Sequence, residues 1–196
     1  MYISETDDTE RSLAIELVLE DIPGGGVVDP DDFKTASTSM GEGALLGVSS
    51  GVYHLFKTAE IYEDEADSET DYKVEKGHEF VVGDFITDSG LVGAAEEITV
   101  IDTTTSALYD IFTVATTLGH AMLDGECIVQ AAAQAAAGSA ALLYSPVGMA
   151  RQSVDLSVAN QGCGIMVRGR VRESLLAYPV DANIKAFAAL SLIRFV

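Results

Sequence analysis

The chain of 196 residues is long enough to bury a substantial core, and its 48% hydrophobic content excludes an intrinsically disordered protein. A formal net charge of −20 argues against a nucleic-acid-binding protein, because nucleic acid phosphates would be repelled. The charge is uneven: residues 136–196 hold six cations and three anions, and the other residues hold five cations and 28 anions. An acidic part and a mildly basic part are therefore expected within one chain.

The first twelve residues (MYISETDDTERS) have neither the basic region nor the apolar stretch of a signal peptide. No apolar run reaches the roughly 18 residues of a membrane helix. We therefore expect a soluble protein, made in a cytoplasm, with no membrane partner. Cys127 and Cys163 are far apart and have no metal-ligand spacing, so two buried free thiols are expected rather than a disulfide.

The elements predicted before residue 60 are strands and turns. Residues 13–20 alternate leucine or isoleucine at odd positions with other residues at even positions, which predicts a half-buried strand with the odd positions inward. Residues 23–26 (PGGG) end it in a sharp turn. Residues 41–47 and 48–57 predict a hairpin that turns at Ser49-Ser50-Gly51.

The middle of the chain opens with a run of like charge at residues 60–71 (EIYEDEADSETD), which predicts a solvated linker. Short β-type segments separated by turn residues follow it, at 72–74, 79–82, 85–87, 97–101, 111–114 and 126–130. About 60 residues of closely spaced strands predict a small barrel or sandwich inserted into a larger β domain.

Residues 131–141 (AAAQAAAGSAA) fit either a helix, by intrinsic propensity, or a loop of small residues, because Gly138 and the lack of apolar bulk disfavour packing. Beyond it, Asp181 can cap a short helix over residues 182–190, and residues 192–196 predict a final strand. A C-terminus this apolar predicts that a partner strand or another subunit holds it.

Residues 165–172 predict a strand with one buried face. Ile165, Val167, Gly169 and Val171 alternate with Met166, Arg168, Arg170 and Arg172, and the first set is expected to face the core. The three arginines then project from the other face about 7 Å apart. They form either a solvated strand face or a row that pairs with carboxylates across a subunit or lattice interface.

Together these elements predict a mainly β fold: a β-sandwich, tulip-like or small-barrel domain with one short C-terminal helix and an inserted small β module. The larger domain takes residues 1–60 and 131–196, and the inserted module takes residues 61–130. We expect the module to be separable, because few contacts cross boundaries of this composition.

The sequence contains no motif for catalysis, a cofactor or a metal. The glycines at 41, 43 and 47 lack the spacing of a dinucleotide-binding loop, and the acidic runs at 29–32 and 63–71 lack that of a calcium loop. His54, His78 and His120 have no neighbouring ligand or base partner, and no G-x-S-x-G sequence occurs. A non-enzymatic protein without a cofactor is therefore expected. The candidate assembly interface combines the arginine row with the apolar end of the chain: Arg168, Arg170, Arg172, Leu192, Ile193, Phe195 and Val196.

Four segments carry a resemblance to a known family: 51–61 (GVYHLFKTAEI), 72–86 (YKVEKGHEFVVGDFI), 98–119 (ITVIDTTTSALYDIFTVATTLG) and 168–196 (RGRVRESLLAYPVDANIKAFAALSLIRFV). They resemble the head fiber or capsid decoration (auxiliary capsid) proteins of tailed bacteriophages, particularly those infecting gut Bacteroidales. The likeness covers most of the chain from about Leu13 onward.

The resemblance implies a non-enzymatic virion protein on the capsid exterior, commonly a homotrimer at local three-fold positions, made in the cytoplasm of the bacterial host. The implied partners are other copies of the chain, the major capsid protein, and another head fibre protein or a host surface glycan. The alternative is an adhesin-like module that recognises host glycan or mucus. With no Trp and only seven Tyr and seven Phe, the sequence leans against a dedicated glycan site, because sugars stack on aromatic rings.

Overall fold

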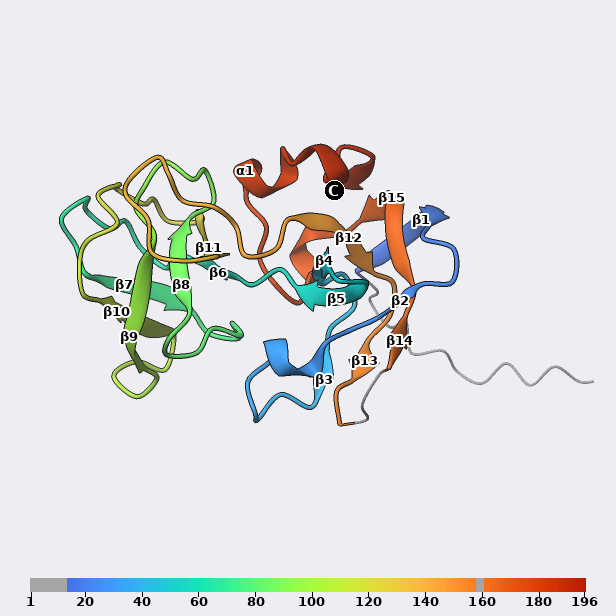
Figure 1. The fold of residues 1–196 in the computed structure, drawn as a ribbon, viewed down its shortest axis with the longest axis horizontal. Helices are drawn as coiled ribbons and strands as arrows, with labels where there is room; N and C mark the ends of the chain where they lie inside the picture. The colour runs from blue at the N-terminus through green and yellow to red at the C-terminus, as the bar shows by residue number, and fades with distance from the viewer. Residues whose placement is uncertain (1–13, 158–160) are drawn as a thin grey trace, which may run out of the picture.

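The computed structural model describes residues 14–157 and 161–196, which form a mainly β protein (Figure 1). The predicted fold class, mainly β with one short helix near the C-terminus, is confirmed. None of the described helices is long and apolar enough to cross a membrane.

The first sheet joins the two ends of the chain. Its strand order is β1 (Ile15–Asp21), β15 (Ile165–Val171), β12 (Pro146–Ala150), β4 (Leu45–Ser49) and β5 (Val52–Leu55), and β16 (Ile193–Phe195) pairs with β15. The β15–β16 pairing is parallel, and the other neighbours pair antiparallel. Two short ribbons extend this part: β2 (Gly26–Val27) with β14 (Gly162–Cys163), and β3 (Ser39–Met40) with β13 (Val154–Asp155).

The second sheet comes wholly from the middle of the chain and lies at the left of Figure 1. Its order is β6 (Thr58–Glu60), β11 (Cys127–Ala131), β8 (Phe85–Asp88), β9 (Glu96–Asp102), β10 (Tyr109–Val114) and β7 (Asp71–Glu75). The helical elements are short: η1 (Pro30–Asp32), η2 (Glu173–Leu175), α1 (Ala182–Lys185) and η3 (Ala188–Leu190).

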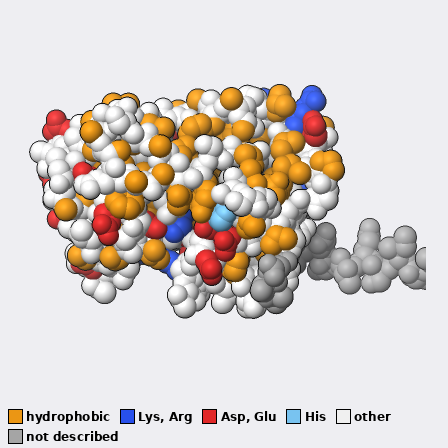
Figure 2. Space-filling view, in the orientation of Figure 1, with side chains coloured by type: hydrophobic (Ala, Val, Ile, Leu, Met, Phe, Trp, Pro, Cys, Tyr) orange, Lys and Arg blue, Asp and Glu red, His pale blue; other side chains and the backbone are white. Residues whose placement is uncertain are grey.

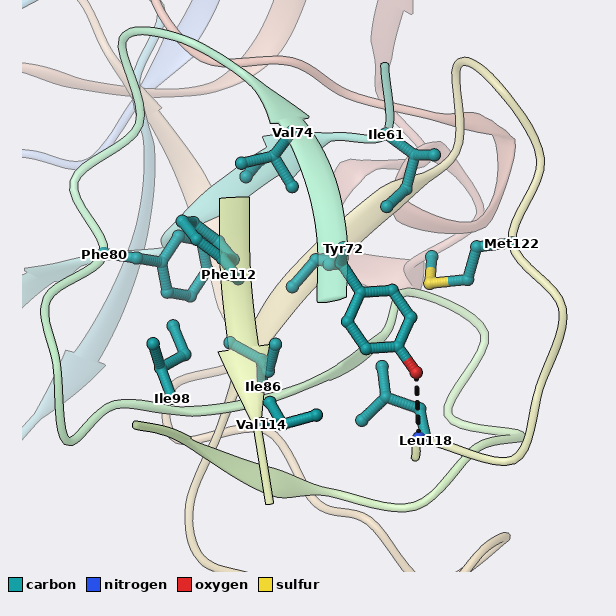
Figure 3. Packing of buried hydrophobic residues seen from close by; sticks show 12 residues of the cluster. Ile61, Tyr72, Val74, Phe80, Ile86, Ile98, Phe112, Val114, Leu118 and Met122 are labelled. Carbon is teal, nitrogen blue, oxygen red and sulfur yellow. Dashed lines mark hydrogen bonds between the residues drawn. The ribbon is translucent and has the colours of Figure 1, made fainter. Parts of the chain in front are cut away.

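A hydrophobic cluster fills the second sheet unit (Figure 3). Tyr72, Phe80 and Phe112 are its largest members, and all three are fully buried. The Tyr72 hydroxyl donates to the Glu69 carbonyl at 2.9 Å and accepts from the Leu118 backbone N–H at 2.9 Å, so the buried phenol has both partners inside the unit. The unit therefore has a core of its own.

Strand β11 connects that core to the rest of the molecule. Ile128 packs into the cluster of the second sheet, while Cys127 and Val129 belong to another cluster with Leu45 of the first sheet and Ile184 of α1. β11 thus packs against two hydrophobic clusters, one on each face. The division into a larger domain and a separable 61–130 module stays a prediction. Both cysteines are free and buried, as expected.

Most predicted strands are confirmed, and so is the hairpin. Ser50 and Gly51 have φ of 52° and 83° between β4 and β5, the left-handed backbone that a tight hairpin turn requires. The predicted segments 72–74, 85–87, 97–101, 111–114 and 126–130 lie in β7, β8, β9, β10 and β11.

The prediction of a strand at 79–82 is wrong, because side-chain hydrogen bonds hold this segment away from the sheet. The Glu79 carboxylate accepts from the Lys34 backbone N–H at 2.9 Å and from Ser37 Oγ at 2.8 Å. Asp84 then accepts from the Val81 backbone N–H at 3.0 Å, which closes a turn. The backbone of residues 79–82 therefore forms a loop and does not pair in the sheet.

The prediction of a solvated linker at 60–71 is also wrong. Ile61 and Glu65 are buried, and they form bridges to Val74 and Met122. The Glu65 carboxylate accepts from the Lys73 backbone N–H at 3.2 Å. Most of the other acidic side chains are exposed, but the backbone of the segment is part of the fold, so a run of like charge did not indicate a linker.

Bulges overturn two predictions of side-chain direction. In β1 the pairing with β15 shifts register, so Leu17 and Leu19 are exposed although they were expected inward; Leu13 lies outside the described residues. In β15 a register shift next to Met166 reverses the alternation, so Met166 is fully buried although it was expected outward.

Of the two alternatives for residues 131–141, the structure shows the loop. It follows the end of β11 at Ala131, with Gly138 at φ 71°. Asp181 caps α1 as predicted by accepting from the Ile184 backbone N–H at 2.9 Å, but α1 ends at Lys185 instead of continuing to 190. The predicted final strand is confirmed by β16.

Because β11 packs against two cores, we predict that the two sheets unfold together. Val129→Ala should lower the free energy of unfolding by about 2 kcal/mol, and Ile128→Ala by about 3 kcal/mol, because each leaves a cavity in a different core. If β11 couples the two units, both variants should shift the same single transition in calorimetry. Val100→Ala, at an exposed position of β9, is the control and should change stability by less than about 0.5 kcal/mol. Two transitions, each moved by only one variant, would show that the units unfold independently.

Candidate assembly surface

Strand β15 and the residue that follows it present Arg168, Arg170 and Arg172 on one exposed face, as the alternation predicted. Between them Gly169 turns inward against β1, where a Cβ atom would lie 2.2 Å from the Leu17 carbonyl oxygen. Only glycine allows that close approach. The tight contact of β1 with β15 thus brings the acidic residue Glu16 beside the arginines.

Two of the three arginines have a partner in their own chain. Arg172 Nε donates to Glu16 Oε1 at 2.8 Å, and Arg170 forms an ion pair with the other carboxylate oxygen. The hydrogen bond from Arg172 is the main cause that lowers the pKa of Glu16, and the positive charge of Arg170 adds to it. The row is therefore partly neutralised before any second molecule arrives.

The end of the chain extends this face through β16. In the parallel pairing Arg194 lies directly opposite Arg170, Ile193 opposite Gly169 and Phe195 opposite Val171. Partners in register share a face, so Arg194 joins the arginine row while Ile193 and Phe195 turn to the core. The expected partner strand of the apolar terminus is thus β15 of the same chain.

The predicted interface residues therefore divide into two groups. Ile193 is buried and Phe195 half-buried within the chain, with the Lys185 ammonium 5.7 Å from the Phe195 ring centroid. Leu192 and Val196 remain exposed. The sequence prediction missed Arg194 and Glu16, although the period of two around Ile193 and Ile15 already placed them outward.

We call the outer surface of β1, β15 and β16 the arginine face, made by Glu16, Leu17, Arg168, Arg170, Arg172, Leu192, Arg194 and Val196. Figure 2 shows basic, acidic and hydrophobic side chains side by side at the upper right, at the end where Figure 1 places β1 and β15. Arginine is enriched in protein interfaces relative to the rest of the surface. This face is the strongest candidate for an assembly surface.

The histidine pairs elsewhere are structural. His54 Nδ1 lies 3.0 Å from Asp32 Oδ2, and that oxygen also accepts from the Leu55 backbone N–H at 3.0 Å. The Tyr144 ring stacks on the imidazole with centroids 4.1 Å apart. Burial raises the pKa of Asp32. The group fastens the η1 turn to β5.

His78 is almost completely buried in the second sheet unit. Its Nε2 lies 3.1 Å from Asp110 Oδ2, and its Nδ1 lies 3.2 Å from the Phe80 backbone N–H, so the neutral ring protonated at Nε2 satisfies both contacts. Burial, followed by the positive charge of Lys34, lowers the pKa of His78 to about 4. The Phe112 ring meets it edge-on at 4.6 Å.

A cavity of about 270 Å³ lies between β6, β7 and the segment 173–179. Glu60, Glu75 and Glu173 line it; burial raises the pKa of Glu60, and the Glu75 charge adds to that rise. His78 also lines the cavity, but both its ring nitrogens have partners within the unit. The lining therefore combines three carboxylates with Lys76 and an imidazole whose two nitrogens are already hydrogen-bonded.

Within residues 14–157 and 161–196, no three histidine, cysteine or acidic side chains are placed to hold a metal ion. Comparison of the chain with family models, curated proteins and solved structures finds no match.

The buried imidazole predicts a loss of stability in acid. The unfolded chain takes up a proton at His78 near pH 6.5, whereas the folded chain resists it until about pH 4. Stability is therefore complete above pH 6.5 and falls as the pH drops towards 4, by up to about 3 kcal/mol from this group. His78→Gln keeps a donor and an acceptor but cannot titrate, so the difference between its pH profile and that of the wild type isolates His78. His120→Gln serves as the control for the effect of a histidine-to-glutamine substitution itself. Parallel profiles for wild type and His78→Gln would refute the assignment.

Proposed function

We propose that this chain is a structural, non-enzymatic virion protein that decorates the exterior of a tailed-phage capsid as a head fiber or decoration protein. The observation that carries the proposal is the arginine face, an exposed basic and aliphatic surface in a chain whose net charge is −20. A subunit that coats a particle needs one end that docks and another that keeps coated particles apart. The likeness of four segments to capsid decoration proteins supports the same proposal.

The charge distribution suits this role. Residues 58–131, which form the second sheet, hold 17 carboxylates against two lysines. Surfaces of this charge repel one another, which keeps large particles soluble. Docking through the arginine face would leave the acidic unit outward, because Figure 1 places the second sheet at the opposite end of the molecule. We propose the major capsid protein as the partner, the virion exterior as the location and a homotrimer as the docked form.

Co-sedimentation with phage heads tests this function. Purified chain, mixed with Bacteroidales-phage heads stripped of their decoration, should pellet with the heads and appear as regular surface density by electron microscopy. Replacing Arg168, Arg170 and Arg172 together by Gln should weaken binding about tenfold or more, since charge-assisted pairs are lost.

Arg151→Gln provides the matched control. Arg151 is also exposed, and it pairs with Asp21 at the end of β1, outside the residues that define the arginine face, so its loss should leave head binding unchanged. Equal binding by the triple Gln variant would exclude the arginine face. Failure to bind any head, together with retention on immobilised mucin, would favour the adhesin-like alternative.

A further inference from the structure

Within residues 14–157 and 161–196, the arginine face carries more positive charge than its ion pairs neutralise. In the described part of the chain, Glu16 is the one carboxylate that forms ion pairs with its four arginines. Arg170 and Arg194 lie directly opposite each other on β15 and β16, and like charges in that position destabilise a sheet. An approaching carboxylate would relieve this repulsion as well as form new pairs.

Aliphatic side chains stand among these arginines. Leu17 is 48%, Leu192 58% and Val196 49% exposed. Leu17 pairs in register with Arg170, and Leu192 and Val196 lie two positions either side of Arg194, so all share the outer face. Ion pairs formed beside groups that exclude water are stronger than pairs in open solvent.

The same chain offers the complementary surface at its other end. We call the segments 61–66 and 122–126 the acidic tip. Two backbone hydrogen bonds between Glu65 and Met122, of 2.8 and 2.9 Å, hold these segments together, and Asp124 N–H donates to Asp64 at 2.9 Å. Asp64 and Asp124 are exposed, and so is Leu123, at 55%. The tip thus presents two neighbouring carboxylates and an exposed aliphatic residue.

We propose that the arginine face of one copy binds the acidic tip of a second copy, head to tail. Charge complementarity selects this arrangement: two arginine faces, or two acidic tips, would repel each other. The two surfaces belong to different sheets at different ends of the molecule, so each copy keeps one free surface for the next contact. Because this contact uses the same arginine face that the proposed function assigns to capsid docking, the two contacts exclude each other on any one copy, and the inference does not rest on the capsid partner.

Sedimentation of the purified chain at several concentrations tests the proposal. Self-association should be evident at about 30 mM salt and be weakened at about 500 mM, because exposed parts of the contact are screened. Arg194→Glu should weaken it about tenfold or more. The same change places a carboxylate opposite Arg170, so the melting temperature should hold or rise, which separates lost association from lost folding.

Mixing variants shows whether the contact is head to tail. Asp124→Lys alters the tip and leaves the arginine face intact, whereas Arg194→Glu does the opposite. Each variant alone should associate weakly, and their mixture should recover association, because it restores one wild-type contact between the two species. Arg151→Glu, outside both surfaces, should associate like the wild type.

Several results would overturn the proposal. A subunit mass that stays monomeric at about 100 μM in low salt would do so, since that concentration exceeds the dissociation constant of most specific contacts. So would normal association by Arg194→Glu, or a mixture that associates no better than its two components. Head binding by a strictly monomeric chain would leave the proposed function standing and remove only this contact.

Discussion

The enclosure of β11 is the constraint on which the rest of the structure depends. All five of its residues are buried. It pairs with β6 on one edge and β8 on the other, Ile128 faces the core of the second sheet, and Val129 faces the cluster shared with the first sheet. A strand enclosed on both edges and both faces tolerates little change, because packed interiors respond to the loss of even one methylene group. The strand is therefore the element that both cores pack against.

Buried carboxylates link the second sheet unit to the remainder of the chain. Asp181 caps α1 and also accepts from the Cys127 backbone N–H at 2.9 Å and from Ser89 Oγ at 2.5 Å, so the C-terminal segment is fastened to β11. Glu79 similarly joins the second sheet unit to Lys34 and Ser37. A buried charge costs free energy unless it is hydrogen-bonded, and these geometries satisfy both groups at a single relative placement. The C-terminal segment and the loop that holds Lys34 and Ser37 are thus each tied to the second sheet unit by a buried carboxylate.

Periodicity in the sequence was enough to place most strands, because half-buried strands mark their inner face with every second residue. The prediction failed where this alternation does not correspond to the buried face. The bulge beside Met166 reverses the inner face without a change in composition, and the 79–82 segment has a strand-like sequence while Glu79 is drawn to a distant loop. For the candidate surface, the arginines of β15 were visible in the sequence. Arg194 became part of it only through a parallel pairing between residues far apart, which no local pattern encodes.

The pairing of β1 with β15 has a consequence for how the chain acquires its fold. Ile15 pairs with Val171, so β1 cannot pair with β15 until nearly the whole chain has been synthesised. Chains dominated by such distant contacts fold slowly, since loop closure costs entropy before any pairing rewards it. During synthesis β1 and β4 would both present unpaired edges, the kind of edge that templates aggregation. Slow refolding and a dependence on chaperones during expression are the expected kinetic cost of a sheet that draws its strands from both ends of the sequence.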